Sequence, residues 1–245
     1  MCYDIQIEKM INEELKRLYT SYLPELKKMY QDLDSEAKRD KSINNYAGPL
    51  LLSCWEEKYL TAKYKLLIFG QETNGWHSEY LYSDSDIDGS IDCYINFRLG
   101  ANYGRVFWSY AHYINQMING NDDLNFVWNN INKFGKNGRG RPNSLVLKNE
   151  IEHFNVLSQE IKILEPDICI FLSGPSYDDD LKCKLPDLRI EPFGNYPLNE
   201  VARLISRSLP SNSYRTYHPR YGNMYQNWYC DVLSEIINAI KRVVL

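Results

Sequence analysis

Two short, almost wholly apolar runs constrain the fold of this chain more than any other feature of its sequence. They are KLLIFG at 65–70 and DICIFLSG at 167–174, and turn residues follow each of them. Short apolar runs bounded by turns are typical of strands buried on both faces, as in a parallel sheet. Two further strands are predicted, LNFVWNNI at 124–131 and the alternating NSYRTYHP at 212–219.

Helical periodicity fills the segments between these strands. Apolar residues at three- and four-residue steps predict helices over 5–40, 104–118, 147–164 and 225–244. Pro24 should start a second helix or kink the first, and 44–52 should form a turn. Alternating strands and helices predict a three-layer α/β/α domain over 61–245, with a central, mostly parallel four-stranded sheet. Residues 1–60 should form a helical extension packed on this domain, with a partner-binding helix as the alternative.

Composition excludes several classes of protein. The net charge of −4 mildly disfavours a nucleic-acid-binding protein, although a local cluster of charges can override the total. The sequence has no membrane-length apolar run and no apolar signal core at its start, so we expect a cytoplasmic protein with no membrane span. The six cysteines are scattered without a C-x-x-C pair, which favours reduced core residues over metal or cluster ligands.

Polar side chains follow all four predicted strands. Glu72 comes just after the first, Asn130 ends the second, the GPSY turn at 174–177 follows the third, and His218 closes the fourth. Ligands of open parallel sheets sit beyond the carboxyl ends of the strands, so we expect these groups to share one site. There a carboxylate can orient water, an imidazole can stabilise an oxyanion, and an amide can read a base. The structural alternatives are a turn cap, a turn residue and a packing hydrogen bond.

A basic segment follows the second predicted strand. NKFGKNGRGRPNS at 132–144 holds Lys133, Lys136, Arg139 and Arg141 and no acidic residue. In an acidic protein this cluster predicts a phosphate-binding surface, with a solvated loop as the alternative. The acidic segment SYDDDLK at 176–182 could suggest a metal, but acids that open a helix complement its dipole, so we predict no metal site. Gly70 to Gly75 lacks the G-K-[ST] of a P-loop, and no cofactor is predicted.

The order of these motifs resembles that of the uracil-DNA glycosylase superfamily. Members carry a strand followed by Gly-x-Asp/Asn, a strand ending in Asn, an apolar strand preceded by a helix and Pro, and a strand ending in His-Pro. The corresponding segments here are IFGQETNG, VWNNINKFGKNGRGRP, IKILEPDICIFLSGPS and YRTYHPRY, within about 64–240. The resemblance implies the α/β/α fold of that superfamily, DNA as the partner, a monomer and no cofactor.

The resemblance also implies roles for individual residues. Glu72 would orient a water and offset positive charge on the sugar, while His218 would stabilise negative charge on the departing base. The base would be bound by Gln71, Asn74 and Asn130 and would stack on Trp76 or Phe97. DNA would be bound by Lys133, Lys136, Arg139, Arg141, Ser176, Arg215, Arg220 and Tyr221, and Tyr221, Met224 or Tyr225 would fill the vacated stack.

Three departures from the superfamily pattern bear on the substrate. Glu72 stands where Asp or Asn is usual, Arg220-Tyr221 replaces Ser-Pro, and Asn74 stands where uracil-specific members place a Tyr that guards pyrimidine C5. We therefore expect a monofunctional DNA glycosylase that excises uracil or a C5-modified pyrimidine, the latter in phage DNA as a defence activity. The alternatives are a catalytically silent nucleic-acid-binding module on the same fold and a nucleoside or nucleotide N-glycosidase.

Overall fold

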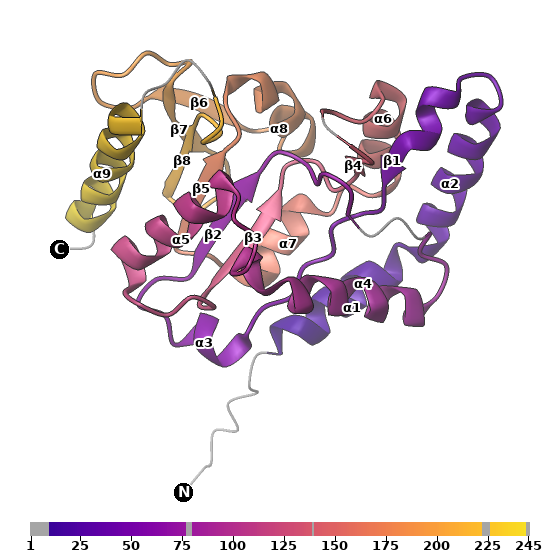
Figure 1. Ribbon diagram of the computed structural model, residues 1–245, viewed down its shortest axis with the longest axis horizontal. Coiled ribbons are helices and arrows are strands. Elements are labelled where there is room, and N and C mark those ends of the chain that lie inside the picture. Colours follow the sequence, from indigo (N-terminus) through magenta and orange to yellow (C-terminus); the bar gives the residue numbers. More distant parts are fainter. Residues whose placement is uncertain (1–9, 77–79, 139, 222–225, 244–245) are drawn as a thin grey trace, which may run out of the picture.

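A six-stranded sheet forms the centre of the protein in the computed structural model, which describes residues 10–76, 80–138, 140–221 and 226–243 (Figure 1). The strand order is β3 (Phe126–Asn130), β2 (Leu66–Gly70), β5 (Ile168–Leu172), β8 (Asn212–Thr216), β7 (Val201–Ile205) and β6 (Arg189–Pro192). The first four strands run parallel, whereas β7 and β6 each pair antiparallel to the preceding strand. The carboxyl ends of the four parallel strands therefore meet at one edge of the sheet.

The four parallel strands occur where the two apolar runs, the segment 124–131 and the alternating segment 212–219 predict them, and the α/β layering is confirmed. The predicted strand count is wrong, because β7 and β6 extend the sheet beyond β8. The edge strand β6 has the sequence RIEP and contains no buried residue. A strand that is charged, ends in proline and has a free edge carries no apolar signal in the sequence.

Helices cover both faces of the sheet. α5 (Val106–Asn119) and α9 (Gln226–Val243) pack together on one face, and α7 (Leu157–Leu164) lies on the other (Figure 1). The helix predicted over 147–164 is in fact α6 (Ser144–His153) followed by α7, with a break at 154–156. Three further helices are α3 (Glu56–Leu60), α4 (Asp84–Phe97) and α8 (Asp178–Lys184). No helix was predicted over 84–97, where α4 begins with a Ser83–Asp86 capping box but buries only three residues.

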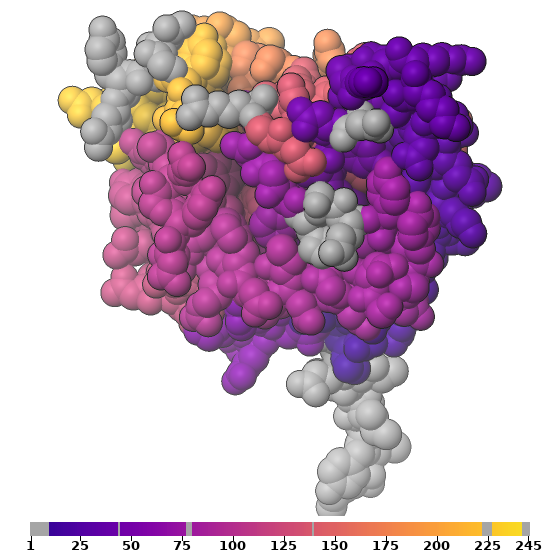
Figure 2. Space-filling model, turned by 45° about the vertical axis from the view of Figure 1, so that its right-hand side comes forward, coloured from indigo at the N-terminus to yellow at the C-terminus, as the bar shows by residue number. Residues whose placement is uncertain are grey.

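The N-terminal helices share the core of the sheet domain. α1 (Ile11–Ser21) packs on α4 and α7, and α2 (Leu23–Ala37), with Pro24 in its first turn, packs on α6. The predicted turn at 44–52 includes β1 (Tyr46–Ala47), which pairs with β4 (Gly135–Lys136). Figure 2 shows the indigo surface of this region meeting the magenta surface of later segments without a gap. Across the described ranges, no helix combines the length and apolarity needed to cross a bilayer.

Candidate active site at the carboxyl ends of the parallel strands

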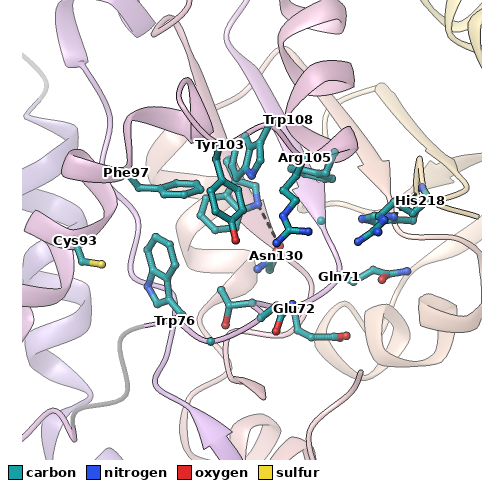
Figure 3. A pocket seen from close by; sticks show the side chains of 17 residues that line it. Gln71, Glu72, Trp76, Cys93, Phe97, Tyr103, Arg105, Trp108, Asn130 and His218 are labelled. Atoms are coloured by element: carbon teal, nitrogen blue, oxygen red, sulfur yellow. Dashed lines mark hydrogen bonds between the residues drawn. The ribbon is translucent and has the colours of Figure 1, made fainter. Parts of the chain in front are cut away.

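An aromatic cavity of about 450 Å³ opens beyond the carboxyl ends of β2, β3 and β8 (Figure 3). This volume lies within the range of small-molecule sites. Six aromatic side chains line the cavity: Trp76, Phe97, Tyr103, Phe107, Trp108 and Trp128. Its polar lining includes Gln71, Glu72, Asn74, Arg105, Asn130, His218 and Arg220. Aromatic walls with a few convergent polar groups are suited to a flat, polar ligand.

Glu72, Asn130 and His218 come from three different strand ends and meet in this cavity. Gly70 lies opposite Asn130 in the β2–β3 ladder, so the turn that carries Glu72 starts level with Asn130. His218 follows β8, which lies on the other side of β5 from β2. The parallel topology thus brings together side chains that are far apart in the sequence, as their positions at strand ends predict.

Asn130 presents a buried amide donor to the cavity. Its side-chain Oδ1 accepts a hydrogen bond from Trp128 Nε1 at 3.2 Å. An indole N–H can only donate, so the amide oxygen must face Trp128 and the amide nitrogen must face away from it. Asn130 is 1% exposed, and its Nδ2 has no hydrogen-bond partner among the described residues. An unpaired buried donor costs about 1–3 kcal/mol, so this group is poised for an acceptor on a ligand.

Gly70 makes this placement of Asn130 possible. A Cβ at Gly70 would lie 2.5 Å from Asn130 Oδ1 and 3.4 Å from the ring of Phe107. Real Cβ atoms do not approach an oxygen so closely, and both neighbours belong to the packed wall of the cavity. Gly70, which ends the first predicted strand, is therefore required because Asn130 packs too closely against it to leave room for a side chain.

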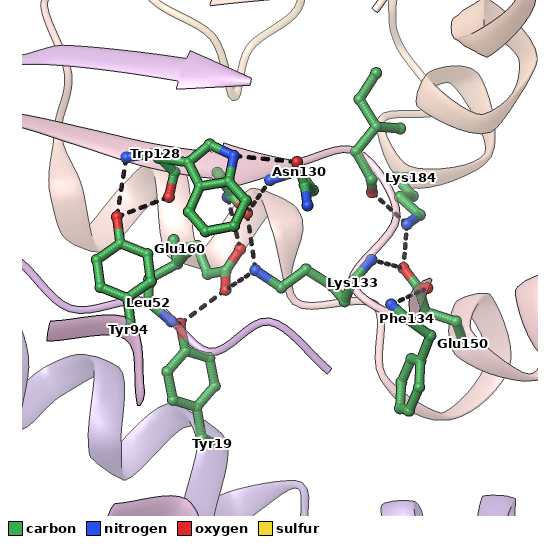
Figure 4. Close-up of polar contacts among 12 residues, drawn as sticks. Tyr19, Leu52, Tyr94, Trp128, Asn130, Lys133, Phe134, Glu150, Glu160 and Lys184 are labelled. Atoms are coloured by element: carbon green, nitrogen blue, oxygen red, sulfur yellow. Dashed lines mark hydrogen bonds and ion pairs between the residues drawn. The ribbon is translucent and has the colours of Figure 1, made fainter. Parts of the chain in front are cut away.

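A buried polar network fixes the backbone of Asn130 (Figure 4). Asn129 Oδ1 accepts the backbone N–H of Asn130 at 2.8 Å and Lys133 Nζ at 2.8 Å. Glu160 on α7 accepts hydrogen bonds from Lys133 Nζ at 2.7 Å, Asn129 Nδ2 at 3.0 Å and Tyr19 of α1 at 2.8 Å. Helices α1 and α7 thus fix the carboxyl end of β3.

Two cations predicted to bind DNA are buried instead, so those predictions are wrong. Lys133 is 0% exposed because its ammonium turns inward to Glu160. Arg215 is 1% exposed, and its guanidinium pairs with Asp178 at 3.1 Å and donates to the carbonyl of Leu198 at 2.8 Å. Neither side chain can reach a phosphate without breaking a buried ion pair.

The other predicted DNA contacts vary in exposure. Lys136 is half-buried and pairs through its backbone with Tyr46, Arg141 forms an ion pair with Asp180, and Arg139 lies outside the described residues. Arg220 is exposed and lines the cavity, whereas Ser176 is exposed in a turn outside the cavity lining. Tyr221 is 41% exposed and stacks on Tyr217 at 4.1 Å between ring centroids. Met224 and Tyr225 also lie outside the described residues.

The Glu72 carboxylate is half-buried and receives a hydrogen bond from a tyrosine. Tyr177 Oη lies 2.7 Å from each carboxylate oxygen. Burial raises the pKa of Glu72 above its ordinary value, while the hydrogen bond from Tyr177 and the charge of Arg141 oppose that rise. The GPSY turn was predicted to border the site, but no role was predicted for Tyr177, because a turn motif does not show where its tyrosine points.

His218 is a neutral imidazole of defined tautomer at pH 7. Burial, with a smaller contribution from the charge of Arg220, lowers the pKa of His218 to about 4. Its Nδ1 lies 3.1 Å from the backbone N–H of Arg220, which can only donate to it. The ring proton of the neutral form must therefore sit on Nε2, which becomes a hydrogen-bond donor. The ring stacks on Phe107 with a centroid distance of 5.7 Å, which fixes its plane.

The base-binding candidates form the remaining walls of the cavity. Trp76 and Phe97 both line it, with their rings edge to face at 5.4 Å, so neither is singled out as the stacking partner. The indole Nε1 of Trp76 is buried and unpaired within the described structure. Asn74 is exposed beside Gly75, where a Cβ would meet no atom of the described residues within 4 Å. The Gln71 amide is held by Ser173 O at 2.7 Å.

Several lining residues were not recognised in the sequence. Tyr103, Arg105 and Trp108 belong to the start of α5 and the loop before it, and Trp128 precedes Asn130 by two positions. Helical periodicity marks the buried face of α5 but cannot show that its first turn borders a cavity. Arg105 is exposed, lies over the ring of Tyr103 at 5.3 Å, and has no acidic partner among the described residues.

Comparisons with known proteins give no information on the chemistry of the site. The chain matches no model of a known protein family, and no curated protein matches it. Within the described ranges, no three His, Cys, Asp or Glu side chains are grouped so that they could hold a metal ion.

Proposed function

We propose that this protein is a DNA glycosylase that hydrolyses the N-glycosidic bond of a flipped-out pyrimidine and leaves an abasic site. The observation that carries the proposal is the convergence of Glu72, Asn130 and His218 on one aromatic cavity. A flipped base needs flat walls to stack on, a polar group for its edge, and charge stabilisation on both sides of the breaking bond. The cavity contains side chains suited to each of these tasks.

The base stacks against the aromatic walls and accepts a hydrogen bond from Asn130. Trp128 occupies one side of the Asn130 amide oxygen, while Nδ2 is unpaired within the described structure. The amide therefore favours an acceptor, such as a ring carbonyl or a ring nitrogen, on the bound base. Satisfying this buried donor recovers about 1–3 kcal/mol, which offsets part of the cost of unstacking the base.

Bond cleavage places opposite charges on the two fragments. The bonding electrons leave with the base, and His218 Nε2–H donates to the base oxygen where negative charge grows. A preorganised donor of this kind typically contributes about 3 kcal/mol to lowering the barrier. The sugar becomes positively charged at C1′, and the Glu72 carboxylate stabilises that charge, orients the water that attacks C1′ and accepts the proton that this water loses. The departing base anion takes up a proton from solvent. The neutral tautomer of His218 suits this role, because the backbone N–H of Arg220 occupies Nδ1 and the ring proton on Nε2 is left to donate to the base.

The cavity wall near Asn74 and Gly75 supports a substrate with a substituent at C5. Asn74 is exposed, and a Cβ at Gly75 would have no neighbour within 4 Å in the described part of the chain. On this basis we propose uracil or a C5-modified pyrimidine as the substrate, with modified phage DNA, and hence defence, as the biological context.

Two cations at the cavity rim support nucleic acid as the partner. Arg105 and Arg220 both line the cavity and are exposed. The Arg105 guanidinium lies over the Tyr103 ring, which leaves its N–H groups available to phosphate. In the proposal these two arginines replace Lys133 and Arg215 as the phosphate contacts nearest the site.

Base release from defined oligonucleotides tests the proposal. Duplex and single-stranded DNA containing uracil, mismatched thymine or C5-substituted cytosine is incubated with the protein, and alkali-labile abasic sites are measured. Glu72→Gln and His218→Ala should each reduce release about 100-fold or more. Glu57→Gln on α3 and His153→Ala on α6, both outside the cavity lining, serve as matched controls. Release from no substrate would remove the enzymatic claim.

The same assays distinguish the alternatives. DNA binding that survives without any base release would favour a catalytically silent binding module. Release from free nucleosides or nucleotides but not from DNA would favour an N-glycosidase that acts on monomers. A preference for plain uracil over every modified base would exclude the phage-defence role.

A further inference from the structure

The carboxylate of Glu72 is held by a residue outside the cavity lining. Tyr177 is 5% exposed, and its hydroxyl lies 2.7 Å from both carboxylate oxygens of Glu72. Its position follows from a short 3₁₀ turn, Pro175–Tyr177, which is separated from the end of β5 by two residues, the second of which is Gly174 with a φ of 78°. The hydrogen bond therefore links the turn after β5 to the turn after β2.

Arg141 holds the other side of Tyr177. Its guanidinium lies over the Tyr177 ring, 4.3 Å from the centroid, within the range of a cation–π contact. The same guanidinium pairs with Asp180 of α8 and donates to the carbonyl of Ser176 at 3.4 Å. Arg141, which the sequence predicts to bind DNA, thus contacts Tyr177, the residue that donates to Glu72.

We infer that Tyr177 is a positioning residue that fixes the orientation of the Glu72 carboxylate in the cavity, and that Arg141 acts through Tyr177 by clamping its ring. Arg141 contacts the Tyr177 ring and the Tyr177 hydroxyl contacts Glu72, so loss of either side chain leaves the Glu72 carboxylate less firmly oriented. The geometric part of the inference is independent of any activity, whereas its consequence for base release rests on the proposed function.

The charges around Glu72 define what a titration should show. The hydroxyl of Tyr177 and the charge of Arg141 favour the ionised carboxylate, and so does the side chain of Asn132, whereas burial and the Glu150 carboxylate on α6 favour the neutral acid. Glu150 is itself paired with Lys184, which reduces its effect. Burial and the nearby Glu72 raise the pKa of Tyr177, so its hydroxyl stays protonated and donates throughout the physiological range.

Carboxyl NMR tests the geometric part directly. Protein labelled with ¹³C at the glutamate side-chain carboxyl is titrated, and Glu72→Gln assigns the Glu72 signal by its loss. Tyr177→Phe removes only the hydroxyl, and it should raise the Glu72 midpoint by about one pH unit. Arg141→Gln should raise the midpoint by a smaller amount. Tyr82→Phe, which changes a half-exposed tyrosine on another segment, should leave the midpoint unchanged.

Base release then tests the catalytic consequence. Tyr177→Phe should shift the acid limb of the pH–rate profile to higher pH by the same amount as the Glu72 midpoint. It should also lower kcat more than it raises KM. An unchanged Glu72 midpoint in a folded Tyr177→Phe protein would overturn the inference. A shifted midpoint in a protein that releases no base from any DNA would support the positioning role while the proposed function fails.

Discussion

Replacing Lys133 with methionine tests how the buried network holds the candidate site. The Lys133 ammonium and the Glu160 carboxylate are 2.7 Å apart, and both side chains are 0% exposed. Lys133→Met keeps most of the volume but leaves the Glu160 carboxylate in the core, where Tyr19 and Asn129 are its remaining donors among the described residues. Removing one partner of a buried ion pair costs about 3–5 kcal/mol, because the remaining charge is uncompensated.

This cost should appear as a large shift in thermal unfolding. For a chain of this length each kcal/mol lowers Tm by about 2–4 °C, so Lys133→Met should melt roughly 6–20 °C below the wild type. The double variant Lys133→Met/Glu160→Gln should recover part of the loss, because it removes the unpaired charge. Lys148→Met on α6 changes an exposed lysine and should melt within a degree or two of the wild type.

The DNA affinity of these variants separates the two interpretations of Lys133. A buried ammonium makes no phosphate contact, so the salt dependence of DNA binding should be the same in Lys133→Met and wild type at temperatures where both are folded. If Lys133→Met melted like the wild type but bound DNA more weakly and with a shallower salt slope, the burial of Lys133 and the role of the network would be refuted.

Three further predictions concern the cavity. Gly70→Ala should cost about 1–3 kcal/mol of stability and abolish base release, because the new Cβ overlaps Asn130 Oδ1; unchanged melting and release would contradict the packing. His218 has a pKa of 6.5 when unfolded and about 4 when folded, so the unfolded state binds the extra proton and stability falls as pH drops through that window. Denaturant titrations should show a loss of about 3 kcal/mol by pH 4 that His218→Gln lacks. Arg105→Gln should reduce the slope of log affinity against log salt by about one, whereas Arg189→Gln on β6 should not.

The parallel core of the fold could be predicted because its strands are buried on both faces. In β2 and β5 this burial is matched by continuous apolar runs, which are visible in the sequence without knowledge of their partners, whereas the equally buried β8 was predicted from its alternating pattern. The same logic extends to the candidate site, since polar residues that follow parallel strands must gather at one edge of the sheet. Glu72, Asn130 and His218 were found in this way.

Elements whose formation depends on their neighbours could not be predicted from the sequence. β6 is an edge strand with no buried residue, and it exists because β7 offers a free edge to pair with. The aromatic wall at the start of α5 is likewise invisible in the periodicity of the helix, which marks a buried face but not what that face borders. Arg105 entered the candidate site only through this placement.

The sequence by itself determined which residues carry charge, and only the tertiary structure decided which of those charges face solvent. Lys133 lies in a loop without acidic residues, yet Glu160, 27 positions later, draws it into the core. Arg215 is buried in the same way by Asp178, 37 positions before it. An ion pair forms between side chains that the chain topology brings into contact, whatever their separation in sequence, so local charge density predicts a binding surface only where no distant partner is buried beneath it.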